Sequence, residues 1–275
     1  MTDLRVPAPM LASPFASGQT VSQFEGNAEW IAEPKLDGVR CTVRISEGVV
    51  AAWSRPRAGG NGALKRTLPA HIVDALRQFP NMVLDGELVC PGGKSPDVAR
   101  LDNQAKLRYV VFDVLELLGT TVIDRPYYER RAYLEQMFKT LQFPAVELIL
   151  VAPVSKTLID AWMSTGGEGA VLKRIDARYR PGARVDYWLK VKGLKSAVLT
   201  ITGFRSGKLG PCSRIDLIDS DGQTTSVACA GMGHAMLRTI EANPTAYIGR
   251  QLAIEYTEKI GDGSYRHPRA DHFVD

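Results

Sequence analysis

The chain has 275 residues, of which 45% are hydrophobic and 23% are charged, and its formal net charge is +4. This balance excludes a disordered chain, a collagen-like chain and a coiled coil, and the length suits one large domain or two modest ones. No apolar run approaches the ~20 residues that span a bilayer. The N-terminal stretch is broken by prolines and lacks the apolar core of a signal peptide. We therefore expect a cytoplasmic protein without a membrane partner.

The first part of the chain contains both strand and helix patterns, and we expect an α+β fold. Apolar residues alternate over 39–53 with Glu47-Gly48 in the middle, and this predicts a hairpin. Segments 82–89 and 107–117 are rich in β-branched or aromatic side chains and are predicted to be strands. Apolar residues at helical spacing predict helices over 69–79 and 126–141. Segment 157–165 is predicted to be a shorter helix that ends at Gly166-Gly167.

After Lys192 the pattern changes to short strands separated by turn residues. The predicted strands are 198–204, 213–218, 223–229 and 251–257, with one helical stretch at 234–242. Five or so strands and one helix within ~80 residues suit a small closed barrel such as an OB-fold. We therefore predict two domains, residues 1–192 and residues 193–275.

The cysteines and histidines show no metal-binding spacing. The four cysteines form no CxxC pair and the four histidines form no HExxH pattern. We expect the cysteines to be reduced thiols in the core. A bound metal would then be held by carboxylate oxygens, which favours magnesium or manganese.

Basic residues gather between positions 173 and 195, where eight lysines and arginines accompany only two aspartates. Such a local excess suits a stripe that contacts phosphates. On charge alone, an ordinary solvated basic face is the more common explanation.

Six short segments carry the chemical information. The first is EPKLDGVR (33–40), which taken alone is a hairpin turn with an ordinary surface lysine. The others follow in the order SRPR (54–57), LDGELV (84–89), YVVFDVL (109–115), EGAVLKR (168–174) and WLKVKG (188–193). In this order the segments resemble the motifs of the covalent nucleotidyltransferase superfamily, most closely those of the ATP-dependent DNA ligases. The resemblance covers residues 33 to 193.

The resemblance implies a fold and an activity. The fold would be a nucleotidyltransferase (ATP-grasp-like) adenylation domain followed by a small β-barrel OB-fold domain. The activity would be the sealing of 5′-phosphate/3′-hydroxyl nicks through a lysine–AMP intermediate and a DNA-adenylate, with release of AMP and pyrophosphate. The expected cofactors are ATP and Mg²⁺ (or Mn²⁺). The expected partner is nicked double-stranded DNA, bound by a monomer.

By the same resemblance, Lys35 is the nucleophile that attacks the α-phosphorus of ATP. A free lysine has a pKa of ~10.4, so its deprotonation at neutral pH costs roughly 4–5 kcal/mol, and neighbouring cations lower that cost. Lys190, Lys192 and a bound metal are the candidates for this effect. Asp37 and Gly38 would shape the turn that exposes the amine.

Further contacts to the nucleotide also come from the resemblance. Glu33 would accept a hydrogen bond from the adenine amino group, and Phe112 would stack on the adenine ring. Arg40 and Arg55 would contact the sugar or the phosphates. Each residue also has an ordinary explanation: a solvated glutamate, a core phenylalanine, and arginines in surface salt bridges.

Two glutamates and three lysines complete the predicted site. Glu87 and Glu168 would contact the ribose and the divalent metal, and both lie beside glycines that let the backbone approach a ligand. Lys173, Lys190 and Lys192 would neutralise the triphosphate. Alternation along WLKVK places its two lysines on one face of a strand and its Leu and Val on the other.

The sequence departs from the family in its final motif. YRHPRADHFVD lacks the usual terminal Arg-x-Asp-Lys, and Arg266 and Arg269 are the candidate substitutes. Only 34 residues precede Lys35, too few for the helical DNA-clamping domain of larger relatives, so we expect the two domains to hold the duplex themselves. The Gly-rich segment SRPRAGGNG (54–62) suits either a DNA-contacting loop or an idle surface loop.

Other functions share some of these features but fit the sequence less well. An RNA ligase or an mRNA-capping guanylyltransferase shares the K-x-D-G chemistry, but Glu33-Pro34 and WLKVKG look more like DNA ligases. An NAD-dependent ligase is disfavoured, because it would need a nicotinamide module and a four-cysteine zinc site, and the sequence shows neither. A non-enzymatic nucleic-acid-binding protein would be expected to have lost Lys35, Glu87 or Glu168, and all three are intact.

Overall fold

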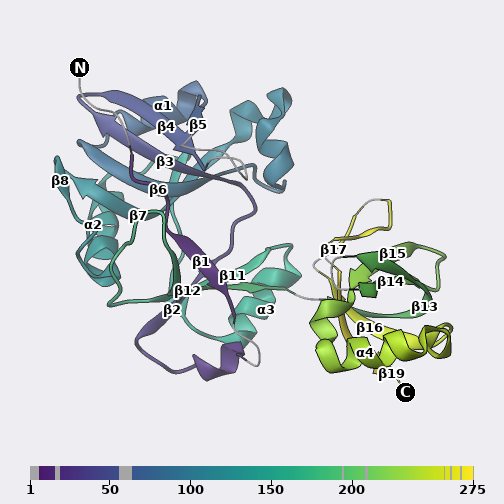
Figure 1. Ribbon diagram of the computed structural model, residues 1–275. Coiled ribbons are helices and arrows are strands. Elements are labelled where there is room, and N and C mark those ends of the chain that lie inside the picture. Colours follow the sequence, from purple (N-terminus) through teal and green to yellow (C-terminus); the bar gives the residue numbers. More distant parts are fainter. Residues whose placement is uncertain are drawn as a thin grey trace. The chain divides into compact units, whose positions relative to one another are not determined.

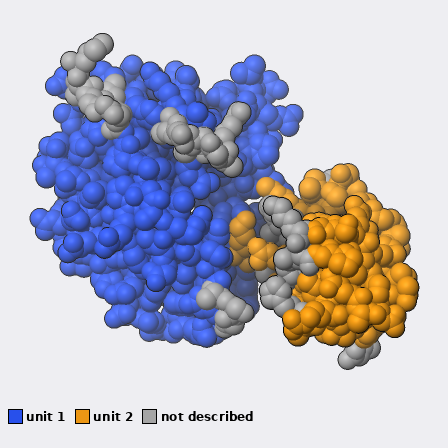
Figure 2. Space-filling view, viewed as in Figure 1, with its two compact units in different colours: residues 1–191 blue, residues 192–275 orange. Residues whose placement is uncertain are grey.

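The computed structural model describes residues 6–15, 19–55, 64–193, 195–207, 210–256, 258–260, 262–266 and 268–274. The chain divides into two compact units, Met1–Val191 and Lys192–Asp275 (Figure 2). In the ranges that the structure describes, no helix is long and apolar enough to cross a membrane.

Unit 1 is built on two β-sheets (Figure 1). The first, called sheet A here, has the strand order β1 (Leu11–Pro14), β12 (Arg184–Lys192), β11 (Gly169–Arg174), β2 (Trp30–Pro34) and β10 (Ala152–Pro153). The second, sheet B, has the order β5 (Leu64–Arg66), β4 (Val49–Ser54), β3 (Val39–Ser46), β6 (Met82–Val89), β7 (Arg108–Leu117) and β8 (Thr120–Thr121), and β9 (Val146–Leu148) pairs with β7.

Three α-helices accompany the sheets: α1 (Ala70–Leu76), α2 (Tyr127–Thr140) and α3 (Lys156–Ser164). All three match helices predicted from the sequence, although α1 ends earlier than predicted. The predicted hairpin and the strands at 82–89 and 107–117 are confirmed as β3–β4, β6 and β7. The patterns do not predict β1 and β11, since β1 is a four-residue strand with a proline and β11 has only three consecutive apolar residues.

Side-chain alternation divides the core of unit 1 into layers. One face of sheet B packs with residues of α1 and α2, and one face of sheet A packs with residues of α3. The inner faces of both sheets share a further cluster, formed by Met10, Val83, Val110, Phe112, Leu115, Ile149, Tyr179, Val185 and Trp188. Two of the candidate site residues, Arg40 and Lys173, lie beside aromatic rings of this interlayer cluster.

A break in the pairing of β6 with β7 places Asp113 on the same face of the sheet as Asp85. The pairing skips Phe112, so that Asp85 lies opposite Asp113 and Gly86 lies opposite Val111. Gly86 is needed there, because a Cβ would lie 2.7 Å from the Tyr109 ring. The glycine of the Asp-Gly-Glu sequence in β6 therefore has a packing reason of its own.

Unit 2 is a five-stranded antiparallel sheet around its own core. Its strand order is β15 (Thr224–Ala228), β14 (Gly210–Ile218), β13 (Lys195–Gly207), β16 (Gln251–Tyr256) and β19 (Arg269–Val274). A small hairpin, β17 (Glu258–Lys259) with β18 (Tyr265–Arg266), and helix α4 (His234–Ala242) complete the unit. The four predicted strands and the predicted helix are confirmed. The sheet curls, and residues of α4 pack into the same core as its inner face.

Candidate active site

Lys35 lies directly after β2, where the chain leaves sheet A and turns toward β3 of sheet B. Its backbone N–H donates to the carbonyl of Gly169 (2.9 Å), which ties the turn to the start of β11. Its ammonium group forms an ion pair with the carboxylate of Glu168, and the two side chains are 21% and 24% exposed. The structure thus brings together the predicted nucleophile and one of the two predicted metal-contacting glutamates.

Gly38 holds the same turn close to β6. A Cβ at this position would lie 2.4 Å from the carbonyl oxygen of Leu88 and 2.8 Å from Cγ of Glu87. The carboxylate of Asp37 accepts a hydrogen bond from the backbone N–H of Ser95 (3.2 Å), in the segment that follows β6. The turn is therefore fixed by contacts on two sides, and a residue with a side chain does not fit at its glycine.

Glu87 lies on β6 opposite Arg40 of β3. Burial raises the pKa of the Glu87 carboxyl group to about 7, and the positive charges of Arg40, Lys35 and Arg55 act in the opposite direction. Arg55 is exposed. Lys35 therefore lies within electrostatic reach of both predicted glutamates.

Glu33 and Lys173 form an ion pair in the interior of unit 1. The Lys173 Nζ lies 2.7 Å from Oε2 of Glu33, and both side chains are 2% exposed. The hydroxyl of Tyr127 donates to the other carboxylate oxygen of Glu33, Oε1, at 2.6 Å. Burial raises the pKa of Glu33 and lowers that of Lys173, while the ion pair between them opposes both shifts.

This placement of Lys173 differs from the sequence-based expectation. We expected Lys173 to neutralise the triphosphate, but its ammonium group is held by Glu33 and lies 4.1 Å from the centroid of the Trp188 ring. A lysine so enclosed reaches a phosphate only by breaking a buried ion pair, which is costly. The alternative of a solvated Glu33 is wrong for the same reason. The apolar alternation of β11 does not predict that Lys173 and Glu33 are paired in the interior, because a burial pattern does not show where the partner of a charge lies.

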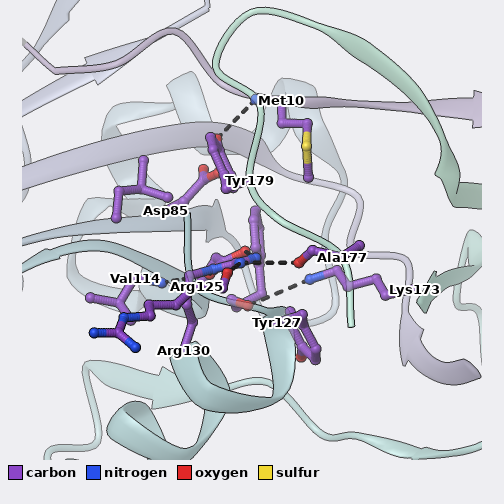
Figure 3. Close-up of polar contacts among 12 residues, drawn as sticks. Met10, Asp85, Val114, Arg125, Tyr127, Arg130, Lys173, Ala177 and Tyr179 are labelled. Atoms are coloured by element: carbon purple, nitrogen blue, oxygen red, sulfur yellow. Dashed lines mark hydrogen bonds and ion pairs between the residues drawn. The ribbon is translucent and has the colours of Figure 1, made fainter. Parts of the chain in front are cut away.

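Arg40 is held by a carboxylate of the protein. Its guanidinium group binds Asp85 through two hydrogen bonds, of 3.0 and 2.5 Å. The hydroxyl of Tyr179 donates to the same carboxylate (2.6 Å) and accepts from the backbone N–H of Met10 (2.8 Å), as Figure 3 shows. Asp85 is fully buried and the Arg40 side chain is 15% exposed. The salt-bridge explanation for Arg40 therefore holds in this structure, although the salt bridge is internal.

Phe112 belongs to the interlayer cluster and is 8% exposed. Its ring has two cations beside it: the Arg40 Cζ lies 5.0 Å and the Lys173 Nζ 4.8 Å from the ring centroid. The Trp188 ring makes an edge contact with Phe112, and its buried indole N–H has no hydrogen-bond partner among the described residues. Phe112 is thus a core residue here, with both Arg40 and Lys173 close to its ring.

Lys190 and Lys192 lie in the last part of β12. Their apolar neighbours Leu189 and Val191 pack in the cluster with α3, so the alternation expected for WLKVK is confirmed. Within the described residues, no group of three or more His, Cys, Asp or Glu side chains is arranged to hold a metal.

The remaining candidates lie elsewhere or are not described. Arg266 is the last residue of β18 and Arg269 the first of β19, both in unit 2. Residues 56–62 of the Gly-rich segment SRPRAGGNG lie outside the described part of the chain.

Comparison with known proteins identifies the family. Residues 9–192 match the model of the ATP dependent DNA ligase domain. The chain belongs to this family. The resemblance read from the six motifs is therefore confirmed, and the family favours a DNA ligase over an RNA ligase or a capping enzyme.

Individual relatives agree with this assignment. A probable DNA ligase of Sorangium cellulosum is 33% identical to this ligase domain over 230 residues, which cover 75% of the chain and 42% of that protein. The bifunctional non-homologous end joining protein LigD of Bacillus subtilis is 30% identical over 211 residues, or 64% of the chain and 33% of that protein. The chain thus spans less than half the length of these curated relatives.

Solved structures show the same fold. A structure of Lig E DNA ligases, described as binding DNA with a minimal scaffold, has a TM-score of 0.68 at 20% identity and covers 98% of this chain and 100% of its own. The ligase domain of Mycobacterium tuberculosis LigD has a TM-score of 0.60 at 23% identity, and the match covers 98% of this chain and 95% of that domain.

Sequence reasoning missed the buried polar residues that support the site of this ligase domain. Arg130 of α2 binds Asp113 through two hydrogen bonds (2.7 and 2.9 Å) and donates to the carbonyls of Arg125 and Ala177, at 2.5 and 3.2 Å (Figure 3). A signal was present, because Asp113 interrupts an apolar strand and Arg130 falls on the apolar face of a predicted helix. A charge at a core position indicates a partner inside the fold.

Proposed function

We propose that this chain is an ATP-dependent DNA ligase that seals nicks between a 5′-phosphate and a 3′-hydroxyl in duplex DNA. The observation that carries the proposal is the setting of Lys35. The lysine lies on a tight turn that leaves its amine partly exposed, in contact with Glu168 and within electrostatic reach of Glu87. Membership of the ATP-dependent DNA ligase domain family supports the same chemistry.

The first step forms a bond between Lys35 and AMP. The amine, after losing its proton, attacks the α-phosphorus of ATP, and the bond to pyrophosphate breaks as the phosphorus–nitrogen bond forms. Glu168 contacts the amine and orients it for this attack. AMP then passes to the 5′-phosphate at the nick, which releases the lysine. Finally the 3′-hydroxyl attacks that phosphate, AMP leaves, and the strand is closed.

We propose that the base binds beside Glu33 and Phe112. Arg40 and Lys173 both lie close to the Phe112 ring, and one of them would make room for the base. Arg40 is expected to move, because its side chain is 15% exposed whereas that of Lys173 is 2% exposed. The freed guanidinium group would then contact the ribose or the phosphates, with Arg55 beside it.

The carboxylates around Lys35 suit a magnesium or manganese ion. Mg²⁺ usually binds one or two protein carboxylates together with substrate phosphates, and it needs no complete protein cage. Glu87 and Glu168 would hold the ion, which when bound neutralises charge on the triphosphate. Lys190 and Lys192 would add positive charge on the same substrate.

We propose that residues 1–192 are the adenylation domain and residues 193–275 an OB-fold domain. The curled five-stranded sheet with one helix in unit 2 supports the second assignment. Arg266 and Arg269 would replace the missing end of the last family motif and contact pyrophosphate. Nicked DNA would be bound by a monomer, with the basic residues between positions 173 and 195, apart from Lys173, on its phosphates.

The test follows each step with ATP labelled at the α-phosphate and a singly nicked duplex with a labelled 5′-phosphate. We expect label on the protein, then sealed product, with ATP and magnesium but not with NAD or GTP. Lys35→Ala should remove both signals. Lys139→Ala, which changes an exposed lysine of α2, is the matched control and should retain both.

The possible outcomes separate the steps. Labelled protein without sealed DNA would show that the acceptor is wrong, and nicked RNA would be tried next. Labelling that persists in Lys35→Ala would show that the nucleophile is wrong. A wild-type protein that takes up no label would overturn the proposed function.

A further inference from the structure

The carboxylate of Glu33 is held by two donors from different parts of unit 1. Lys173 of β11 donates to Oε2 at 2.7 Å, and Tyr127, the first residue of α2, donates to Oε1 at 2.6 Å. Tyr127 is 2% exposed and lies 94 residues from Glu33 in the sequence. It belongs to none of the six family-like motifs, so nothing in the resemblance assigns it a role.

This arrangement leaves Glu33 able to accept further hydrogen bonds. An ionised carboxylate offers about four lone-pair sites, of which Tyr127 and Lys173 occupy one on each oxygen. The free site on each oxygen can accept from a ligand. Because both protein partners are donors, the carboxylate is kept as an acceptor and its plane is fixed from both sides.

We propose that Tyr127 is the positioning residue that sets base selection through Glu33, an inference that rests on the proposed function. A fixed acceptor matches the 6-amino group of adenine, which donates. The fixed carboxylate disfavours the 6-oxo group of hypoxanthine or guanine, because two acceptors facing each other leave buried lone pairs without a donor. Discrimination of this kind, which depends on unpaired buried polar groups, is stronger than that of an apolar pocket.

Loss of the Tyr127 hydroxyl would relax this selection. In Tyr127→Phe the ring and its packing remain, but Oε1 of Glu33 loses its donor. The carboxylate can then rotate or take up a proton on that oxygen, and a protonated carboxyl donates to a 6-oxo group. Tyr127→Phe should therefore label its lysine more slowly with ATP. Its labelling rate with a 6-oxo purine nucleotide should rise relative to its rate with ATP.

The experiment measures lysine labelling with ATP and with inosine triphosphate, both labelled at the α-phosphate. The two nucleotides differ only at the 6-position edge of the base, so their ratio of kcat/KM isolates that contact. We expect Tyr127→Phe to lower the ATP-to-inosine triphosphate ratio by about tenfold, the effect of losing one hydrogen bond to a charged group. A purely structural effect of the substitution would lower both rates and leave the ratio unchanged.

Two further variants make the result specific. Tyr109→Phe removes another buried tyrosine hydroxyl of unit 1, one that donates to the carbonyls of Cys41 and Leu84, and it should leave the ratio unchanged. Glu33→Gln should lower the ratio by itself. Adding Tyr127→Phe to Glu33→Gln should then have no further effect, because Tyr127 acts through Glu33.

The outcomes distinguish this inference from the proposed function. A wild-type protein without label would overturn the proposed function and this inference with it. Normal wild-type labelling with an unchanged ratio in Tyr127→Phe would overturn only the role of Tyr127. An equal effect of Tyr127→Phe with and without Glu33→Gln would also overturn it, because Tyr127 would then act independently of Glu33.

Discussion

Replacing Glu87 by glutamine should stabilise unit 1 at alkaline pH, although Glu87 is a proposed metal contact. Burial raises the pKa of this carboxyl group from 4.5 to about 7. The folded state therefore holds its proton more tightly than the unfolded state. As the pH rises from 4.5 to 7, the unfolded state loses this proton first, and the folded state loses stability. Above pH 7 the full loss in the free energy of unfolding is reached.

The size of the effect follows from the two pKa values. A difference of about 2.5 corresponds to about 3 kcal/mol at 1.36 kcal/mol for each pKa unit. Solvent reaches part of the side chain and screens the charge, so we expect about 1–3 kcal/mol above pH 7. Glutamine has the same shape and no charge to desolvate, and the variant should be more stable than the wild type by that amount. At pH 5 the difference should fall below about 1 kcal/mol.

Urea unfolding followed by tryptophan fluorescence suits this measurement, because Trp30, Trp53, Trp162 and Trp188 all lie in unit 1. The free energy of unfolding is compared at pH 5 and pH 8.5 for the wild type and Glu87→Gln. Glu135→Gln, at a side chain that is 52% exposed, is the control and should show no such pH-dependent gain. Equal stability of Glu87→Gln and wild type at both pH values would refute the argument from burial.

Two other substitutions test the packing around the site. Gly38→Ala should lower the free energy of unfolding by about 1–3 kcal/mol and slow lysine labelling, because the new Cβ would lie 2.4 Å from the Leu88 carbonyl oxygen. Thermal unfolding and the labelling rate measure the two effects, and an unchanged labelling rate would contradict the prediction. Arg130→Met should cost about 3–5 kcal/mol in urea unfolding, because it leaves the buried charge of Asp113 without its partner. Adding Asp113→Asn should recover part of that loss, and no recovery would show that Arg130 stabilises the fold through its carbonyl contacts instead.

Local patterns in the sequence predicted much of the fold. Helix α2 and strands β3 and β4 follow from apolar spacing within one segment, and β6 and β7 follow from their β-branched and aromatic side chains. Spacing of this kind depends on the backbone period and on which face is buried, and both are local properties. The short strands β1 and β11 were missed, because they owe their conformation to pairing with distant strands rather than to their own residues.

The sequence by itself determined the family and the residue that we propose as nucleophile, since six motifs in order identify both. Only the tertiary structure decided which charges are buried and which groups neutralise them. Glu33 is hydrogen-bonded to Tyr127, which lies 94 residues away in the sequence, and Arg40 is hydrogen-bonded to Asp85, which lies 45 residues away. A buried charge must be paired within the fold, but any of several distant residues could pair with it, and the packing of the two sheets selects the one that does. The ion pair with Glu33 therefore holds Lys173 in the interior of unit 1, and not at the phosphate site that the motifs implied.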